Sequence, residues 1–358
     1  EALRRFCHQF DKKILNAFLQ EDLVRFRHSD GPQGHAESNY PLSDYSTGPS
    51  GHGLSAAGGL AASHRAVGLD TKVFVLMGDA ESAEGITYEI RNLASTLGLQ
   101  NLIVSFDYNH FGLDGPIEEV VRSPILNHWL GLGWNVIEIN GHDILQCIKA
   151  YQLAFAGFEN NLPTVVLAHT IKGKDYGQVA NTSASHGLPA KHEEYVQIVQ
   201  KLGFNILGKP DDVMTDIETI IDTITPQDCA YIEQIVRQNA IRITPERDLI
   251  KQIKKTLQGR NIIDPRVIKR PLEMPKELIF AAGEKLATRK AASYWFKWLM
   301  NQTAFFYAGA GDISGSVLFK ETEDVYGLIN QNNPIGRGIR FGIAEQNMAM
   351  FSSALTQD

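Results

Sequence analysis

Residues 72–85 read KVFVLMGDAESAEG, and residues 101–115 read NLIVSFDYNHFGLDG. Each stretch starts with an unbroken apolar run, which is typical of a strand buried on both faces of a parallel sheet. Between them, four apolar residues recur at helical spacing before a stop signal at Gly98: Ile86, Ile90, Leu93 and Leu97. We therefore expect strand, helix and strand in succession.

The same rhythm continues on both sides of this segment. A helix rich in Ala and Gly is expected at 54–68, and further strands at 133–139 and 163–169, with a helix after Asp143. Alternating strands and helices predict an α/β fold built on a parallel sheet.

The chain divides into three predicted regions. Residues 1–204 form the first α/β domain, which begins with a charged amphipathic helix near residues 1–30. Residues 205–275 are charged, helix-prone and interrupted by prolines, as expected of a helical connector. From residue 276 to 358 a second α/β pattern begins. We expect the first domain to lack its N-terminal part and the second to lack its C-terminal part.

Composition excludes several classes of protein. Of 358 residues, 43% are hydrophobic and 21% charged, which is ordinary for a globular protein. A net charge of −7 with no basic face argues against a nucleic-acid partner, and no apolar run reaches the about 20 residues that span a bilayer. Three distant cysteines, Cys7, Cys147 and Cys229, suggest a reducing compartment, so a cytoplasmic location without a membrane partner is expected.

Oxygen donors follow two neighbouring strands. Asp79 comes directly after the first apolar run, and Asn109 follows the second. The carboxyl ends of parallel strands meet at one rim of the sheet, where ligands of such folds bind. A carboxylate, an amide oxygen and a backbone carbonyl suit a hard cation such as Mg²⁺. Alternatively, Asp79 only caps a helix or forms a turn.

An ordered set of motifs resembles the transketolase family of thiamine diphosphate enzymes. Its members, in family order from about Val24 to Ala354, are GHAES, STGPSGHG, MGDAESAEGITYE, LDG, GWNVIEINGHD, HGLP, ATRK and FGIAEQ. This resemblance implies that residues 1–204 are a diphosphate-binding domain and that residues 276–358 begin a pyrimidine-binding domain.

The resemblance also implies a cofactor site with Mg²⁺ or Ca²⁺. The implied metal ligands are Asp79, Asn109 and the carbonyl of Phe111. The implied thiamine diphosphate contacts add Gly48, Ser50, Gly78, Ala80, Ile171, His186, Asp312 and Glu345. Three positions depart from the family pattern: Ala80 replaces a Gly, Ser50 an apolar residue and His52 a Gln.

Catalytic and substrate roles are carried over in the same way. Glu345 matches the carboxylate that activates the cofactor, although a glutamate at a helix start has a purely structural explanation too. His35 and His186 match positions that handle substrate protons, where an imidazole works near neutral pH. Arg289 and Ser316 match positions that hold a sugar phosphate, although a helix-surface Arg is otherwise simply solvated. A family segment bearing a further histidine is absent upstream of EDLVRFR.

These matches imply transfer of a two-carbon ketol unit from a ketose phosphate to an aldose phosphate through a thiamine diphosphate carbanion and enamine. They also imply a homodimer with the cofactor at the subunit interface. Two alternatives stay open. FGIAEQ and HTIKGKDYG also resemble deoxyxylulose-phosphate synthase and 2-oxoacid dehydrogenase components. The chain could also be an incomplete, non-catalytic cofactor-binding fragment.

Overall fold

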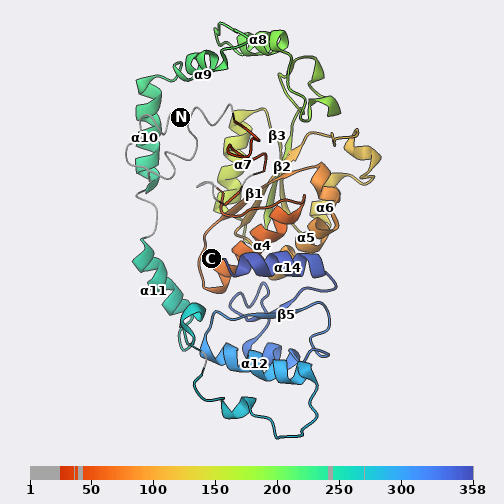
Figure 1. Cartoon of the computed structure of the whole chain (residues 1–358), viewed down its shortest axis with the longest axis vertical. Coiled ribbons are helices and arrows are strands. Elements are labelled where there is room, and N and C mark those ends of the chain that lie inside the picture. Colours follow the sequence, from red (N-terminus) through yellow and green to blue (C-terminus); the bar gives the residue numbers. More distant parts are fainter. Residues whose placement is uncertain (1–24, 36, 39–42, 241–244, 270, 358) are drawn as a thin grey trace. The chain divides into compact units, whose positions relative to one another are not determined.

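The computed structural model describes residues 25–35, 37–38, 43–240, 245–269 and 271–357 (Figure 1). Most of the helix predicted near residues 1–30 therefore lies outside the described residues. The chain forms two compact units, each described by itself. The "sheet unit" comprises residues 51–108, 121–169 and 245–358, and the "loop unit" comprises residues 1–50, 109–120 and 170–244.

A parallel sheet forms the centre of the sheet unit and confirms the predicted α/β fold. Its four strands are β1 (Val73–Gly78), β2 (Leu102–Tyr108), β3 (Asn135–Asn140) and β4 (Thr164–His169), in the order β1-β2-β4-β3. Gly78 pairs with Asp107, so β1 and β2 end at almost the same level. β2 and β4 are central; most of their residues are buried and none is exposed, as their apolar runs predict.

Helices cover both faces of this sheet (Figure 1). They are α4 (His52–Ala66), α5 (Gly85–Leu97), α6 (Ile125–Leu130) and α7 (Ile144–Ala156). The α5 stripe predicted from spacing is the buried one, and Gly98 ends the helix in the left-handed conformation at φ 69°. On the other face, Ala150 and Ala154 of α7 pack on Ile103, Ile139 and Val166.

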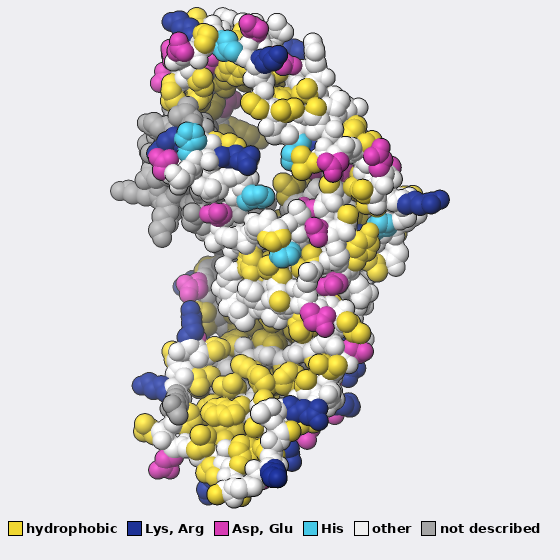
Figure 2. All heavy atoms as spheres, turned by 45° about the vertical axis from the view of Figure 1, so that its right-hand side comes forward, with side chains coloured by type: hydrophobic (Ala, Val, Ile, Leu, Met, Phe, Trp, Pro, Cys, Tyr) yellow, Lys and Arg dark blue, Asp and Glu magenta, His cyan; other side chains and the backbone are white. Residues whose placement is uncertain are grey.

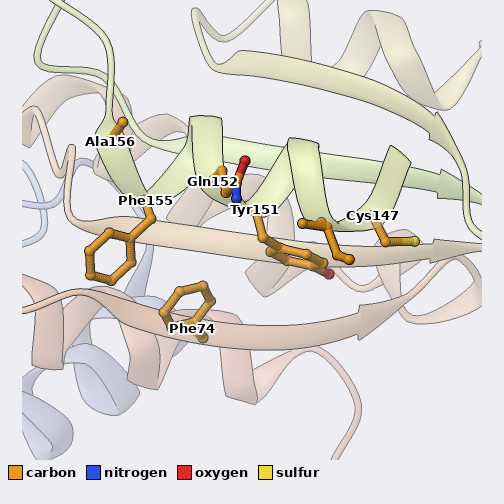
Figure 3. Close-up of a pocket in the computed structure, with 7 residues that line it drawn as sticks. Phe74, Cys147, Tyr151, Gln152, Phe155 and Ala156 are labelled. Atoms are coloured by element: carbon orange, nitrogen blue, oxygen red, sulfur yellow. The ribbon is translucent and has the colours of Figure 1, made fainter. Parts of the chain in front are cut away.

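The expectation that β1 is buried on both faces is wrong. Phe74 and Leu76 are 51% and 79% exposed. Their partners in β2 are Ile103 and Ser105, which lie on the α7 side of the sheet. Because β1 is the edge strand, α7 does not reach over it. An open apolar groove remains between β1 and α7, where Phe74 faces Phe155 and Tyr151 (Figure 3).

The last third of the chain adds a small second layer to the sheet unit. It contains α11 (Glu246–Thr256), α12 (Thr288–Gln302), β5 (Ala308–Ala310), α13 (Lys320–Tyr326), β6 (Gly338–Arg340) and α14 (Glu345–Leu355). β5 and β6 pair in parallel. α14 packs directly on α4, where the hydroxyl of Ser55 lies 2.7 Å from Oδ1 of Asn347 and both residues are fully buried.

The loop unit carries three helices in its described part, α8 (His192–Lys201), α9 (Val213–Ile221) and α10 (Pro226–Ala240). Short 3₁₀ turns occur in both units: η1 (Ala80–Ala83), η2 (Ile117–Glu119), η3 (Gly177–Val179), η4 (Ser183–Ser185), η5 (Pro265–Val267) and η6 (Lys276–Leu278). Most of these turns lie in the long connections between helices and strands.

The surface, the helices and the cysteines can be compared with the expectations from composition. On the face drawn in Figure 2, basic and acidic side chains are interspersed. Within the described ranges, no helix combines the length and the apolar character that crossing a membrane requires. Of the two described cysteines, Cys147 is a half-buried free thiol and Cys229 is buried.

Candidate functional site

Asp79 is fixed at the carboxyl end of β1. It is the first residue after the strand and only 1% exposed. Its backbone N–H donates to the carbonyl of Asp107 at 3.1 Å, which extends the β1–β2 ladder by one bond. Its own carbonyl accepts the hydroxyl of Ser82 at 2.5 Å, within η1. A carboxylate is thus buried at the rim where ligands of parallel sheets bind.

Asn109 begins the segment that follows β2. Its amide oxygen accepts the backbone N–H of Phe111 at 3.1 Å, across His110 in the left-handed conformation at φ 68°. The turn is closed by a bridge between Phe111 and Pro116. His110 Nδ1 lies 2.7 Å from Glu118, and this hydrogen bond lowers the pKa of the Glu118 carboxyl. The carbonyl of Phe111 therefore occupies a defined place.

Lys172 is a site residue that the sequence analysis missed. Its ammonium donates to the carbonyl of Phe111 at 2.8 Å and to that of Gly112 at 3.4 Å. The carbonyl oxygen has two lone pairs and can accept a second partner. A lysine in the glycine-containing loop after β4 is a signal that could have found it, because such loops reach the ligand rim.

The residues present fit a divalent cation and a diphosphate by their chemistry. A carboxylate, an amide oxygen and a carbonyl are the oxygen donors that Mg²⁺ and Ca²⁺ accept. At Gly48 and at Gly78, a Cβ atom would meet nothing within 4 Å, so the backbone at both positions borders open space. Ala80 is exposed at the first position of η1. Gly48 and Ser50 lie exposed in the loop unit.

The predicted catalytic histidines, His35 and His186, and the predicted cofactor contact Ile171 belong to the loop unit. His35 and His186 are both exposed, and Ile171 is 44% exposed. The loop that carries His186 is held internally: the His186 N–H donates to Ser183 at 3.0 Å, and the Tyr176 hydroxyl donates to the carbonyl of Leu188 at 2.7 Å. Their side chains are accessible, as a role in substrate contact requires.

Glu345 and Asp312 lie on the segments that follow the two strands of the small second sheet. Glu345 is the exposed first residue of α14, and its Oε1 would lie 3.8 Å from a Cβ placed on Gly311. Asp312, the next residue, adopts the left-handed conformation at φ 60°. The loops after β5 and β6 therefore bring the Glu345 carboxylate close to Gly311, the residue before Asp312.

Arg289 and Ser316 also meet. The guanidinium of Arg289, in the first turn of α12, donates to the Ser316 hydroxyl at 3.3 Å, and both side chains are exposed. They are 27 residues apart in sequence, so the fold creates this pair. A guanidinium beside a hydroxyl can bind a phosphate group.

The sheet, the buried carboxylate beyond β1 and the open backbone at Gly78 define a parallel α/β protein with oxygen ligands and free space at the strand ends. The family described as "Transketolase, thiamine diphosphate binding domain" matches residues 17–236, more than half of the chain. The chain therefore belongs to the transketolase family, as its motifs predict.

Relatives of known name agree with this assignment. Transketolase 2 of Escherichia coli is 35% identical over 199 residues, which are 52% of this chain and 29% of the relative. Transketolase 1 of Saccharomyces cerevisiae is 28% identical over 356 residues, which are 94% of this chain and 50% of the relative. The crystal structure of transketolase from Campylobacter jejuni has a TM-score of 0.69 and 26% identity, covering 94% of this chain and 50% of that one. The chain thus spans half or less of the length of these relatives.

Proposed function

We propose that this chain binds thiamine diphosphate together with Mg²⁺ or Ca²⁺ and catalyses transketolase-type ketol transfer between phosphorylated sugars. The observation that carries the proposal is the buried carboxylate of Asp79 at the end of β1, in a chain whose matched family is a thiamine diphosphate binding domain. Beside it, a Cβ atom on Gly78 would meet nothing within 4 Å, so a ligand can approach the backbone there.

Each predicted residue has a role in this proposal. Asp79, the Asn109 side chain and the Phe111 carbonyl hold the cation, and the backbone at Gly78, Ala80, Gly48 and Ser50 borders the diphosphate. Ile171, Asp312 and His186 complete the cofactor contacts. When bound, the cofactor supplies an electron sink for the carbon–carbon bond that is broken and formed.

Protons at the site are moved by two kinds of side chain. With the cofactor bound, the carboxyl group of Glu345 would hydrogen-bond to its pyrimidine ring and support the form of that ring that accepts a proton. The exposed imidazoles of His35 and His186 exchange protons with substrate hydroxyls, because an imidazole can both donate and accept a proton.

Arg289 and Ser316 support a phosphorylated substrate. Their contact at 3.3 Å presents a positive charge and a hydroxyl to solvent, and a sugar phosphate is the substrate class that this pair fits. We propose a homodimer with the cofactor at its subunit interface as the active assembly, by analogy with the family.

Calorimetry with thiamine diphosphate and Mg²⁺ tests cofactor binding directly. We expect binding by the native chain and at least a hundredfold loss, about 3 kcal/mol, in Asp79→Ala, because the cation loses its charged ligand. Asp70→Ala removes an exposed carboxylate just before β1, at the opposite end of that strand, and should bind normally. If the native chain bound no thiamine diphosphate at millimolar Mg²⁺, the proposal would fail, and a non-catalytic, structural role would be the remaining interpretation.

The substrate class requires a separate assay. Turnover of xylulose 5-phosphate with an aldose phosphate supports the proposal. Turnover of pyruvate with an artificial electron acceptor, and none of the sugar phosphate, would assign the chain to the 2-oxoacid dehydrogenase type.

A further inference from the structure

A carboxylate that the proposed function does not use connects the sheet to the start of α4. Glu81, in η1, is only partly exposed. Its Oε1 accepts the backbone N–H of Gly78 at 2.8 Å, and its Oε2 accepts that of Gly51 at 2.8 Å. The two bonds use both carboxylate oxygens, and the second reaches 30 residues back along the chain.

Both N–H groups need a partner from outside their own element. The N–H of Asp79 bonds to β2, so that of Gly78, one residue earlier, faces the open edge of the strand. Gly51 is the N-cap of α4, which has no side-chain cap and no acidic residue in its first turn. In a capping box, a Glu inside the helix bonds to the N–H of the N-cap residue. Here Glu81 does so from another element.

Gly51 has little freedom to move. Its φ is 78°, and a Cβ there would lie 2.7 Å from Cγ2 of Thr87 and 3.0 Å from Cβ of Glu84. The residue is thus packed against the start of α5 while Glu81 bonds to its N–H. Because Gly51 directly follows Ser50, fixing Gly51 also fixes the end of the loop predicted to contact the cofactor.

We propose that Glu81 is a positioning residue that ties Gly51, the residue directly after the predicted cofactor contact Ser50, to the end of β1 beside Asp79. Glu81 does not touch the cofactor. It orders the N-terminus of α4 before the cofactor binds. The entropic cost of ordering this segment therefore does not reduce the binding free energy. This inference rests on the proposed cofactor site.

Two effects of the Glu81 charge oppose each other. Its hydrogen bonds order the loop, but its negative charge repels an approaching diphosphate. The hydrogen bonds prevail in our proposal because they are charge-assisted and the carboxylate lies at a helix N-terminus, which offsets its charge. Removing Glu81 should therefore weaken cofactor binding rather than tighten it.

The test compares three full-length variants with the native chain. Calorimetry at saturating Mg²⁺ should show thiamine diphosphate binding about tenfold weaker in Glu81→Ala, because both hydrogen bonds that order Gly51 and Gly78 before binding are lost. Glu81→Gln keeps one acceptor oxygen and should recover part of the affinity. Asp143→Ala removes another carboxylate that caps a helix: Asp143 follows β3, the edge strand farthest from β1, and caps α7. It should lower the unfolding temperature without changing the dissociation constant.

Hydrogen exchange without the cofactor gives a second readout. Peptides spanning Gly51 and Gly78 should exchange faster in Glu81→Ala and as in the native chain in Asp143→Ala. Unchanged or tighter cofactor binding in Glu81→Ala would overturn the proposal, even if exchange accelerates. If the native chain itself binds no cofactor, the proposed function fails, and the exchange experiment still decides whether Glu81 holds the two segments together.

Discussion

The contact between α4 and α14 allows a sharp test, because one added methyl group should separate the two helices. At Gly59, a Cβ atom would lie 2.3 Å from the carbonyl oxygen of Phe351 and 2.9 Å from Cβ of Ala354. Favourable carbon contacts begin near about 3.5 Å, so Gly59→Ala must push α14 away by about 1 Å. The nearest atom belongs to the backbone and cannot rotate aside.

The expected magnitude follows from two terms. Overpacking of a tight core costs about 1–3 kcal/mol. Replacing Gly by Ala inside a helix returns up to about 1 kcal/mol. Subtracting the full helix term leaves a loss of about 0–2 kcal/mol in the free energy of unfolding of Gly59→Ala, and about 1–3 kcal/mol relative to a Gly→Ala change without the clash. Since Glu345 begins α14, cofactor activation should also decline.

Gly53→Ala is the matched control in the same helix. A Cβ at Gly53 would meet only Cγ2 of Val75, at 3.8 Å, which is an ordinary contact. This variant should be neutral or more stable by up to about 1 kcal/mol, because only the helix term remains. Urea unfolding of the cofactor-free chain measures both variants. If Gly59→Ala were as stable as Gly53→Ala, the close approach of α4 and α14 would be refuted.

Three further predictions concern packing, pH and substrate. Trp129 is fully buried, so Trp129→Ala should cost about 3–5 kcal/mol in urea unfolding, and a loss below about 1 kcal/mol would contradict its core position. Backbone and side-chain hydrogen bonds from Gln146 lower the pKa of the Asp143 carboxyl. Its contribution is therefore complete above the ordinary carboxyl pKa and is lost as pH falls through the lowered value. In thermal unfolding, Asp143→Asn should have a lower unfolding temperature than the native chain at neutral pH, and the two temperatures should converge in acid. A difference in unfolding temperature that does not change with pH would contradict the role of the Asp143 charge. Arg289→Ala should raise KM for a sugar phosphate tenfold or more, about 1.4 kcal/mol, and leave KM for an unphosphorylated sugar unchanged; equal effects on both would exclude phosphate binding.

Local patterns sufficed for much of the fold. The α5 stripe and its stop at Gly98, the helix after Asp143 and the central strands β2 and β4 all follow from periodicity and turn chemistry. The motif order indicated the transketolase family. These features depend on residues that are close together or in a fixed order along the chain. They can therefore be predicted from one sequence without a structure.

The same patterns could not predict which strands lie at the edges of the sheet. An apolar run predicts burial but does not say whether a strand lies at the centre or the edge. β1 is an edge strand, and Phe74 and Leu76 remain exposed because α7 covers only the other strands on that face.

The candidate site, too, was predicted only in part from the sequence. Sequence by itself determined which residue types follow the strands, and so nominated Asp79, Asn109 and Glu345. Only the tertiary structure decided their surroundings: Lys172 on the Phe111 carbonyl, Arg289 against Ser316, and Glu81 between Gly78 and Gly51. Most of these contacts join residues 27 to 61 positions apart, and their partners are chosen by packing and by backbone groups that need a hydrogen bond rather than by spacing along the chain.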